Sequence, residues 1–141
     1  MIKPGSLREH LVAALPRLSE SPDKLLVFID AGRAIATGVE TMSFEYRYNL
    51  NLVLTDFSGG PDDVFVPLLQ WVRLHQRELL DNPQRRDEIR FEADLLDHGQ
   101  VDLSITLPLT ERVIVRQQEG GGIAIAHAPE PELPPAIYGT P

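Results

Sequence analysis

The clearest pattern in the chain is the alternation of apolar and polar residues between Ser43 and Asp56. A period of two is typical of a strand with one buried face and one face in water. At about 3.3 Å per residue the stretch spans about 40 Å, well beyond the usual strand of about five or six residues. Its apolar side consists of Phe44, Tyr46, Tyr48, Leu50, Leu52 and Leu54. The sequence therefore predicts one very long strand that crosses the whole domain.

A helix is predicted near the N-terminus. Ser6 and Glu9 match the capping box, in which the serine hydroxyl and the glutamate carboxylate each satisfy a free backbone N–H at the helix start. The helix is therefore expected to begin near Leu7, and Pro16 should kink or end it, since its ring removes one backbone hydrogen bond. The apolar stripe of this helix consists of Leu7, Leu11, Ala14, Leu15 and Leu18.

A hairpin is expected between this helix and the long strand. The short apolar run Leu25–Asp30 suits a buried strand better than a helix. Ala31 and Gly32 should then turn the chain, so that the stretch Arg33–Gly38 pairs back on the first arm.

A second helix is predicted after the long strand. Pro61 suits the first turn of a helix, and the carboxylates of Asp62 and Asp63 are favoured near its positive end. Pro67 is awkward inside a helix, so we expect either a kink there or a later start, near residue 64. The helix should stop by Asp81.

The rest of the chain alternates as strands do. Tight connections at Asp97–Gln100 and Gly120–Gly122 indicate hairpin turns. Pro108 cannot donate to a strand ladder, so the strand that contains it should end, bulge or lie at an edge there. The four predicted strands are Ile89–Leu95, Val101–Leu109, Val113–Arg116 and Ile123–Ala126. In the strand Ile89–Leu95, alternation predicts that the buried side consists of Ile89, Phe91, Ala93 and Leu95.

These elements define an α+β fold. Tight turns dominate the connections, so we expect a single domain with a mainly antiparallel sheet, one very long strand, and two helices that cover one face. A chain of 141 residues is long enough for one such core. We assign residues 1–127 to this domain and residues 128–141, which contain five prolines, to an extended C-terminal tail.

Composition narrows the classes of partner. The net charge is −8, whereas nucleic-acid-binding domains usually carry a basic patch, so we expect no specific nucleic-acid binding. The absence of cysteine excludes a disulfide scaffold, a thiol nucleophile and thiolate metal sites. No stretch approaches the roughly 20 apolar residues of a membrane span, and the N-terminus lacks the apolar segment of a signal peptide. We therefore expect a soluble, cytoplasmic protein without membrane contact.

No pattern typical of catalysis is present. The stretch Gly120–Gly122 lacks the Lys-Ser/Thr of a phosphate-binding loop and is interpreted as a turn. No serine stands in a Gly-x-Ser-x-Gly elbow, and the four histidines show no ligand spacing. His75 is interpreted as a partly buried structural residue. Trp71, Tyr46 and Tyr48 fall at core-facing periods and are interpreted as core residues.

Two charged clusters remain as candidate sites. The carboxylates around the turn near Asp97 suit a hard cation, but their spacing lacks the order of a calcium loop, and alternation places Glu92 and Asp94 on the solvent side, so a solvated hairpin end is the preferred interpretation. This acidic cluster consists of Glu92, Asp94, Asp97, His98 and Asp102. A second group, Arg85, Arg86 and Arg90, either meets a phosphate or a partner carboxylate or is simply solvated surface. We predict no enzyme, no cofactor and no metal, and therefore an assembly or binding protein.

Four stretches of the chain occur together in one known family: Leu25–Gly32 (LLVFIDAG), Ser43–Gly59 (SFEYRYNLNLVLTDFSG), Val66–Asp97 (VPLLQWVRLHQRELLDNPQRRDEIRFEADLLD) and Val101–Arg116 (VDLSITLPLTERVIVR). They resemble the tail completion protein R family of contractile-tailed temperate phages and related prophages. The likeness covers about residues 6–117, most of the chain. Several long segments in the same order make it much more specific than a short motif.

The resemblance implies a structural protein that acts at the head-proximal end of the tail tube, stops growth of tube and sheath, and prepares the tail for joining to the head. It implies assembly in the host cytoplasm and a place in the virion tail, with tail tube, sheath and head-completion or connector proteins as partners. The order of elements is also similar to that of tail terminator proteins, which form six-fold rings, so a homo-oligomeric ring is expected. A head–tail connector or another small assembly adaptor is the alternative.

The polar side of the long strand is the candidate functional surface, since no reaction chemistry is found elsewhere. A ring requires head-to-tail contacts between copies, and a strand about 40 Å long would supply part of such a contact or face the lumen. The predicted interface residues are Glu45, Arg47, Asn49 and Asn51.

Overall fold

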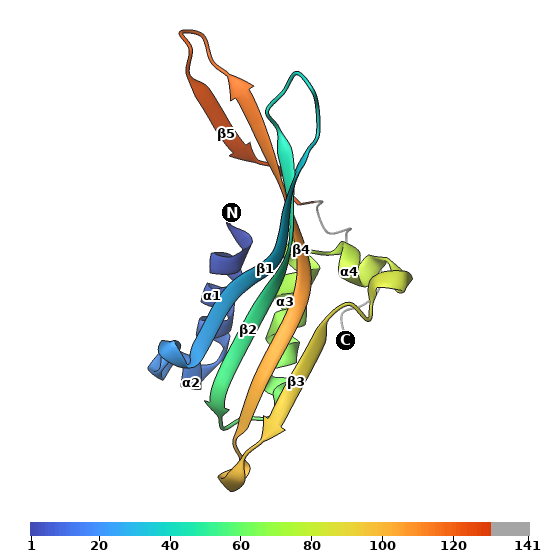
Figure 1. Ribbon diagram of the computed structural model, residues 1–141. Coiled ribbons are helices and arrows are strands. Elements are labelled where there is room, and N and C mark those ends of the chain that lie inside the picture. The colour runs from blue at the N-terminus through green and yellow to red at the C-terminus, as the bar shows by residue number, and fades with distance from the viewer. Residues whose placement is uncertain (131–141) are drawn as a thin grey trace, which may run out of the picture.

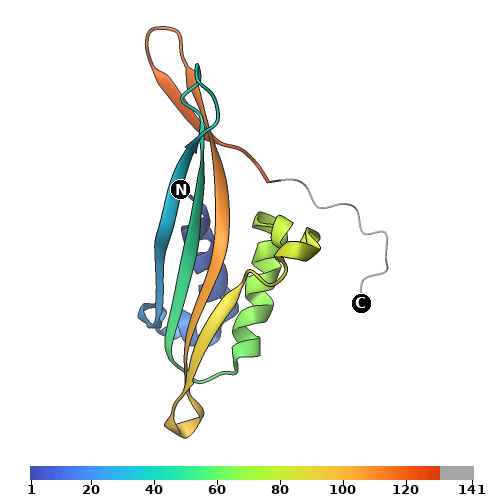
Figure 2. The same ribbon diagram turned by 45° about the vertical axis from the view of Figure 1, so that its right-hand side comes forward.

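The computed structural model describes residues 1–130 and shows an elongated antiparallel sheet with helices on one face (Figure 1). The strand order is β1-β2-β4-β3, and β5 pairs with the far end of β4. The strands are β1 (Leu25–Ala36), β2 (Phe44–Phe57), β3 (Arg90–Leu95), β4 (Val101–Gln117) and β5 (Ile123–His127). The helices are α1 (Lys3–Ala14), α2 (Pro16–Glu20), α3 (Pro61–His75) and α4 (Glu78–Asp81), with short 3-10 turns at Pro22–Lys24, Pro83–Arg85 and Asp97–Gly99. Figure 2 shows α1 and α3 behind the same face, which confirms the predicted fold class.

The first helix begins earlier than the sequence predicts. α1 starts at Lys3, so Ser6 lies inside it and the predicted capping box is wrong. The Ser6 hydroxyl instead accepts a hydrogen bond from the indole N–H of Trp71 on α3, at 3.1 Å. The Glu111 carboxylate meets the helix start, because its Oε1 accepts from Ile2 N at 2.7 Å and from Lys3 N at 3.4 Å. A cap from a distant strand leaves no local signal in the sequence.

Prolines mark the helix boundaries. α1 ends before Pro16, which opens the short α2, as predicted from its missing backbone donor. α3 begins at Pro61 and continues through Pro67, so the later start near residue 64 is wrong. The Asp63 carboxylate accepts a hydrogen bond from Gly60 N–H at 3.2 Å and thereby satisfies one free donor of the first turn.

β1 is a single strand, so the predicted hairpin turn at Ala31 and Gly32 is wrong. Both arms pair with β2, and the register shifts between Asp30 and Arg33. Ala31 and Gly32 together lie opposite Tyr48 alone, which is the two-against-one arrangement of a β-bulge. The chain turns later, in the loop of residues 37–43 between β1 and β2.

β2 confirms the predicted long strand and pairs along its length with the still longer β4, which has 17 residues. β4 unites the predicted strands Val101–Leu109 and Val113–Arg116, so the expected break between them is wrong. Pro108 lies where one side of β4 is free, because β3 pairs with it only up to Thr106 and β5 only from Val113. The predicted edge position of Pro108 is thereby confirmed.

The core lies between the sheet and the helices α1 and α3. The strands contribute Leu50, Leu52, Leu54, Leu103, Ile105 and Leu107, and the helices contribute Leu7, Leu11, Val64, Leu68, Trp71 and Val72. Full burial of one such aliphatic side chain stabilises the fold by about 2 kcal/mol relative to exposure. One face of β2 and β4 is therefore buried against the helices, and the other face is not covered by them.

β3 departs from the alternation that the sequence predicts. All six of its residues are exposed, including Phe91, Ala93 and Leu95, which were expected on the buried side. The helices cover the central strands and leave this edge open, so only Ile89, just before the strand, packs partly against the core. The Phe91 ring meets the ring of Phe65 on α3 edge-on, with centroids 5.3 Å apart.

Candidate assembly surfaces

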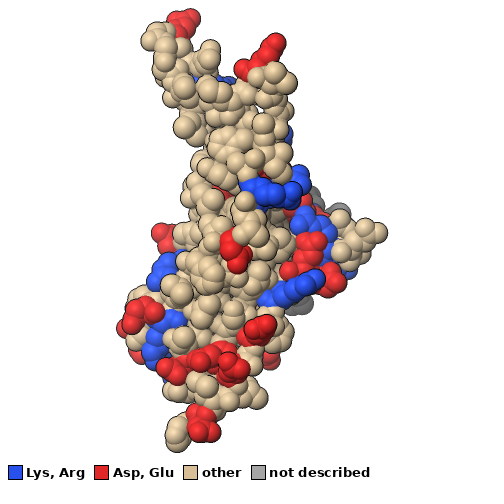
Figure 3. All heavy atoms as spheres, viewed as in Figure 1, with Lys and Arg blue, Asp and Glu red and all other residues tan. Residues whose placement is uncertain are grey.

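The sheet face away from the helices carries the predicted interface residues of β2. Glu45, Arg47, Asn49 and Asn51 share this face, because side chains alternate along a strand. The Arg47 guanidinium donates from Nε to Glu45 Oε2 at 2.9 Å, so these two charges neutralise each other. Figure 3 looks onto this face and shows basic side chains near its middle and acidic side chains toward its lower end.

Asn51 differs from the other three, because it is only 7% exposed. It lies between Phe28 of β1 and Thr106 of β4, and the Thr106 hydroxyl donates to Asn51 Oδ1 at 2.8 Å. Asn51 Nδ2 has no hydrogen-bond partner among the described residues. Asn51 therefore lies beneath the polar face, and the interface role of the four residues stays a prediction.

A hollow of about 540 Å³ opens in the polar face beside Asn49. Glu88 is the one acidic residue among those that line it, whereas four arginines do so: Arg33 of β1, Arg47 of β2, Arg85 of the 3-10 turn Pro83–Arg85, and Arg90 of β3. Arg85 forms ion pairs with Glu78 at 2.9 Å and with Glu88 at 2.8 Å, and its hydrogen bond to Glu88 raises the pKa of the guanidinium. Two of the four arginines are therefore paired with carboxylates, whereas Arg33 and Arg90 form no ion pair among the described residues.

The predicted arginine cluster is only partly assembled. Arg85 and Arg90 meet at the hollow, whereas Arg86 turns away and donates to the Leu80 carbonyl at 2.8 Å. Arg33 joins them from β1, which sequence spacing gave no means of predicting because the two segments are far apart in the chain.

Two hairpins project beyond the helices at one end of the molecule (Figure 1). One ends in the loop of residues 37–43, and the other ends in the predicted glycine turn, where Gly120 and Gly121 have positive φ. Ser43 ties the hairpins together, since its hydroxyl accepts a hydrogen bond from Val115 N–H at 2.9 Å.

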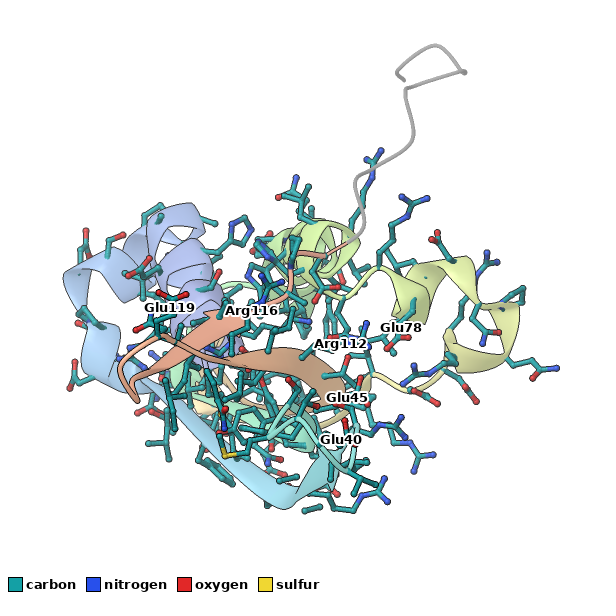
Figure 4. All side chains as sticks on the ribbon, turned by 90° about the horizontal axis from the view of Figure 1, so that it is seen from above. Glu40, Glu45, Glu78, Arg112, Arg116 and Glu119 are labelled. Atoms are coloured by element: carbon teal, nitrogen blue, oxygen red, sulfur yellow. The ribbon has the colours of Figure 1, made fainter. Side chains whose placement is uncertain are left out.

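The projecting hairpins present both charged and aliphatic side chains. Figure 4 looks down on them, with Glu40 and Glu45 on the β1–β2 hairpin and Arg112, Arg116 and Glu119 on the β4–β5 hairpin. The exposed aliphatic residues of this end are Val39, Met42, Ile123 and Ile125. Isolated strand pairs are marginally stable in water, so these hairpins suit contact with another protein.

A buried polar network lies beneath the hairpins and joins the N-terminus, α3 and β4. Lys3 Nζ donates to Gln76 Oε1 at 2.7 Å and to the Thr110 carbonyl at 2.6 Å. Tyr48 Oη donates to Glu111 Oε2 at 2.6 Å, and burial together with this hydrogen bond raises the pKa of Tyr48. Lys3 and Glu111 are each only 4% exposed, so their charges depend on these partners.

The aromatic and histidine predictions are confirmed in the core. Trp71 and Tyr48 are buried, and Tyr46 is partly buried against the core. His75 is partly buried and stacks on Trp71, with ring centroids 4.7 Å apart. Burial, followed by the nearby Lys3 charge, lowers the pKa of His75.

The acidic hairpin tip forms at the predicted turn. Asp94 lies opposite Asp102 across β3 and β4, and Asp102 Oδ1 accepts a hydrogen bond from Asp56 N–H at 2.8 Å. Within residues 1–130, no group of three or more His, Asp or Glu side chains is placed to hold a metal ion. In the same part of the chain, no helix is long and apolar enough to cross a membrane.

An extended antiparallel sheet with open edges, a polar face, projecting hairpins and helices on one side defines the class of the protein, a single α+β domain with large exposed surfaces. Residues 1–131 match the family model described as P2 phage tail completion protein R (GpR). The chain is 36% identical over 138 residues to tail completion protein R of Escherichia phage P2, an alignment that covers 97% of this chain and 88% of that protein. No solved structure matches the chain. The chain therefore belongs to the tail completion protein R family of structural phage tail proteins, as its sequence segments indicate.

Proposed function

We propose that this protein caps the head-proximal end of the tail tube, ends the growth of tube and sheath, and prepares the tail for joining to the head. The observation that carries this proposal is the family match, which spans the described domain from its first residue. Its partners are then the tail tube and sheath proteins below and head-completion or connector proteins above. It acts by contact, without catalysis, cofactor or metal and without specific nucleic-acid binding.

The proposed working form is a homo-oligomeric ring, a hexamer by analogy with tail terminator proteins. A ring needs surfaces for neighbouring copies and for the tube. The open sheet edges and the projecting hairpins supply surfaces of these kinds. The proposed contact or lumen surface is the polar face with Glu45, Arg47 and Asn49, with Asn51 beneath it.

The proposed division places the domain at residues 1–127 and an extended tail at residues 128–141. The beginning of that tail is held by Glu130, which forms an ion pair with the buried Lys3 at 2.5 Å. Residues 131–141 lie outside the described part of the chain. The ring is expected to assemble in the host cytoplasm before the head and tail meet.

The test is a deletion of the gene in the phage or prophage that encodes this chain. Separate heads and defective or overlong tails are expected, and supply of the protein in trans should restore joined particles. Electron microscopy of labelled protein should place it at the tube end. Normal particles from the deletion would contradict the proposal, and label at the head portal would favour a head–tail connector.

A further inference from the structure

The sheet ends in two unpaired edges, β1 on one side and β3 on the other. The register puts them at the same level, since Val27 pairs with Leu52, Leu52 with Ile105, and Ile105 with Phe91. Because every strand is antiparallel to its neighbour, β1 and β3 run in opposite directions. A second copy placed beside the first in the same orientation therefore presents its β1 antiparallel to the first copy's β3.

The two edges also match in length and in side chains. β3 supplies the six residues Arg90–Leu95, and β1 offers the six residues Leu25–Asp30 before its bulge. On the helix side of the sheet, Phe91 is 56% exposed, Leu95 is 86% exposed and Ile29 is 37% exposed. Neither stretch contains the proline or lysine with which many proteins block open strands.

The backbone of β1 is free to accept a further strand at Val27 and Ile29, whereas Arg8 of the same copy occupies the outward carbonyl of Leu25. The Leu25 carbonyl points away from β2, because it accepts a hydrogen bond from Arg8 Nη1 at 2.7 Å. Hydrogen-bonding directions alternate along a strand, so Val27 and Ile29 also point their backbone groups outward. Among the described residues, neither of these two donates or accepts a bond on that side.

We infer that β3 of one copy pairs with β1 of the next copy, with Arg90 facing Asp30. This inference rests on the proposed ring and names its contact. Neither Arg90 nor Asp30 forms an ion pair within the described chain, and opposite charges that face each other across strands are stabilising. The other facing pairs are Phe91 with Ile29, Glu92 with Phe28, Ala93 with Val27, Asp94 with Leu26, and Leu95 with Leu25.

This register is selected by the faces of the strands. A shift by one residue would turn the apolar side of one strand toward the polar side of the other, so only shifts by two keep the helix face continuous. Among those, this register pairs all six residues of both stretches and places Phe91 beside Ile29. It covers the exposed apolar residues of β3, which the helices of its own copy leave open.

Pairing of like edges fits less well. Two copies of β3 in antiparallel order would place Glu92 opposite Glu92 or opposite Asp94, and like charges directly opposite are destabilising. Two copies of β1 would leave β3 uncovered. The contact between unlike edges repeats from copy to copy, as the head-to-tail contacts of a ring require. In this register Phe91 faces Ile29, two residues from the Val27 that lies at its own level, so the next copy is shifted along the strands by about 7 Å. A ring closes with such a shift when the strands are inclined to its axis.

The test uses tails assembled with the double variant Asp30→Cys and Arg90→Cys, in a chain that has no cysteine of its own. Facing residues on antiparallel strands lie within reach of a disulfide, so oxidation should link copies into a ladder from dimer to full ring on a denaturing, non-reducing gel. The matched control pairs Asp30→Cys with Thr106→Cys. Thr106 lies opposite Arg90 but one strand further inside, so this control should give no ladder.

Tails that contain the double variant but give no ladder overturn the pairing, and so does a ladder that stops at dimers. If the double cysteine variant is not incorporated into tails, reversal of the charges at positions 30 and 90 tests the pairing instead. Arg90→Asp or Asp30→Arg alone should lower incorporation about tenfold, and the combination should restore it, because the charges face each other again. A combination no better than the single variants overturns the pairing. Each of these results would overturn the pairing alone, since the unaltered protein would still be found at the tail end. Absence of the unaltered protein from the tail end would instead contradict the proposed function.

Discussion

At the residue scale, Glu111 connects parts of the chain that are far apart in sequence. Its carboxylate accepts hydrogen bonds from the backbone of Ile2 and Lys3 and from the hydroxyl of Tyr48. Glu111 is almost completely buried, so its charge is stabilised by these donors in place of water. The residue therefore caps the first helix and holds it against the two longest strands.

Replacement of this carboxylate by an amide should weaken the fold. Glu111→Gln turns one acceptor into a donor beside groups that already donate, so the free energy of unfolding should fall by about 2 kcal/mol. Urea unfolding followed by circular dichroism measures the change. The same substitution at the exposed Glu119 is the matched control and should change stability by less than about 0.5 kcal/mol. Equal effects at both positions would show that the Glu111 contacts do not stabilise the fold.

His75 should make stability depend on pH. Its pKa is lowered in the folded chain from the ordinary 6.5, so the unfolded chain binds more protons as the pH falls. The contribution of His75 is therefore fully present above pH 6.5 and is lost as the pH falls through the lower folded value. Urea midpoints between about pH 7.5 and about pH 5.5 should fall less for His75→Gln than for the unaltered chain. A pH dependence that is unchanged in His75→Gln would contradict the assignment.

At the scale of single elements, the bulge in β1 is the feature that most changes the predicted strand arrangement. Ala31 has a φ of 50°, a left-handed conformation that costs a residue with a Cβ about 1–2 kcal/mol. The bulge lets β1 continue along β2 instead of turning back on itself, and it separates the two arms that sequence reasoning treated as a hairpin. The same interruption ends the regular edge of β1 at Asp30.

Glycine at the bulge should stabilise the protein. Ala31→Gly removes the clash of the Cβ at positive φ, so stability should rise by roughly 0.5–1 kcal/mol. Thermal and urea unfolding both measure this. Ala34 lies in the regular part of β1 opposite Tyr46, so Ala34→Gly is the matched control and should lower stability by roughly 0.5–1 kcal/mol. A loss at both positions would mean that the bulge does not impose the strain.

At the scale of the whole molecule, the two faces of the sheet differ in what covers them. One face is filled by the helices, and the other carries the polar residues and the arginine hollow. The uncovered edge β3 and the projecting hairpins add exposed apolar residues that contribute little to the core of a single copy. These features agree with the proposal that neighbouring copies cover the surfaces that one copy leaves open.

An exchange of the two charges on β2 separates assembly from folding. Glu45→Arg combined with Arg47→Glu keeps their ion pair but reverses the charges offered to a partner. Stability of the isolated chain should change by less than about 0.5 kcal/mol, because surface pairs contribute little, while the yield of joined particles should fall at least about tenfold. Urea unfolding and plaque counts measure the two effects. A variant that is folded and fully active would show that these two charges take no part in assembly.

Local patterns predicted much of the fold. The alternation in β2, the turn glycines at Gly120 and Gly121, and Pro16 at the end of α1 act through the nearest neighbours in the chain, so the sequence alone shows them. The family segments depend only on residue order, and the match over residues 1–131 confirms them. The candidate surface on β2 was predictable as a polar face because alternation sets which side chains share a side.

Long-range packing decided the rest. The start of the first helix is capped by the Glu111 carboxylate and not by the Ser6 hydroxyl that the local pattern predicted. The turn expected at Ala31 is a bulge, because both arms of β1 pair with β2. The side chains of β3 stayed exposed since the helices lie over the central strands, and Asn51 was buried by its neighbours on both sides. The sequence by itself determined the strands, their polar sides and the family. Only the tertiary structure decided caps, burial and open edges, because these depend on residues that meet across the fold and leave no periodic trace in the chain.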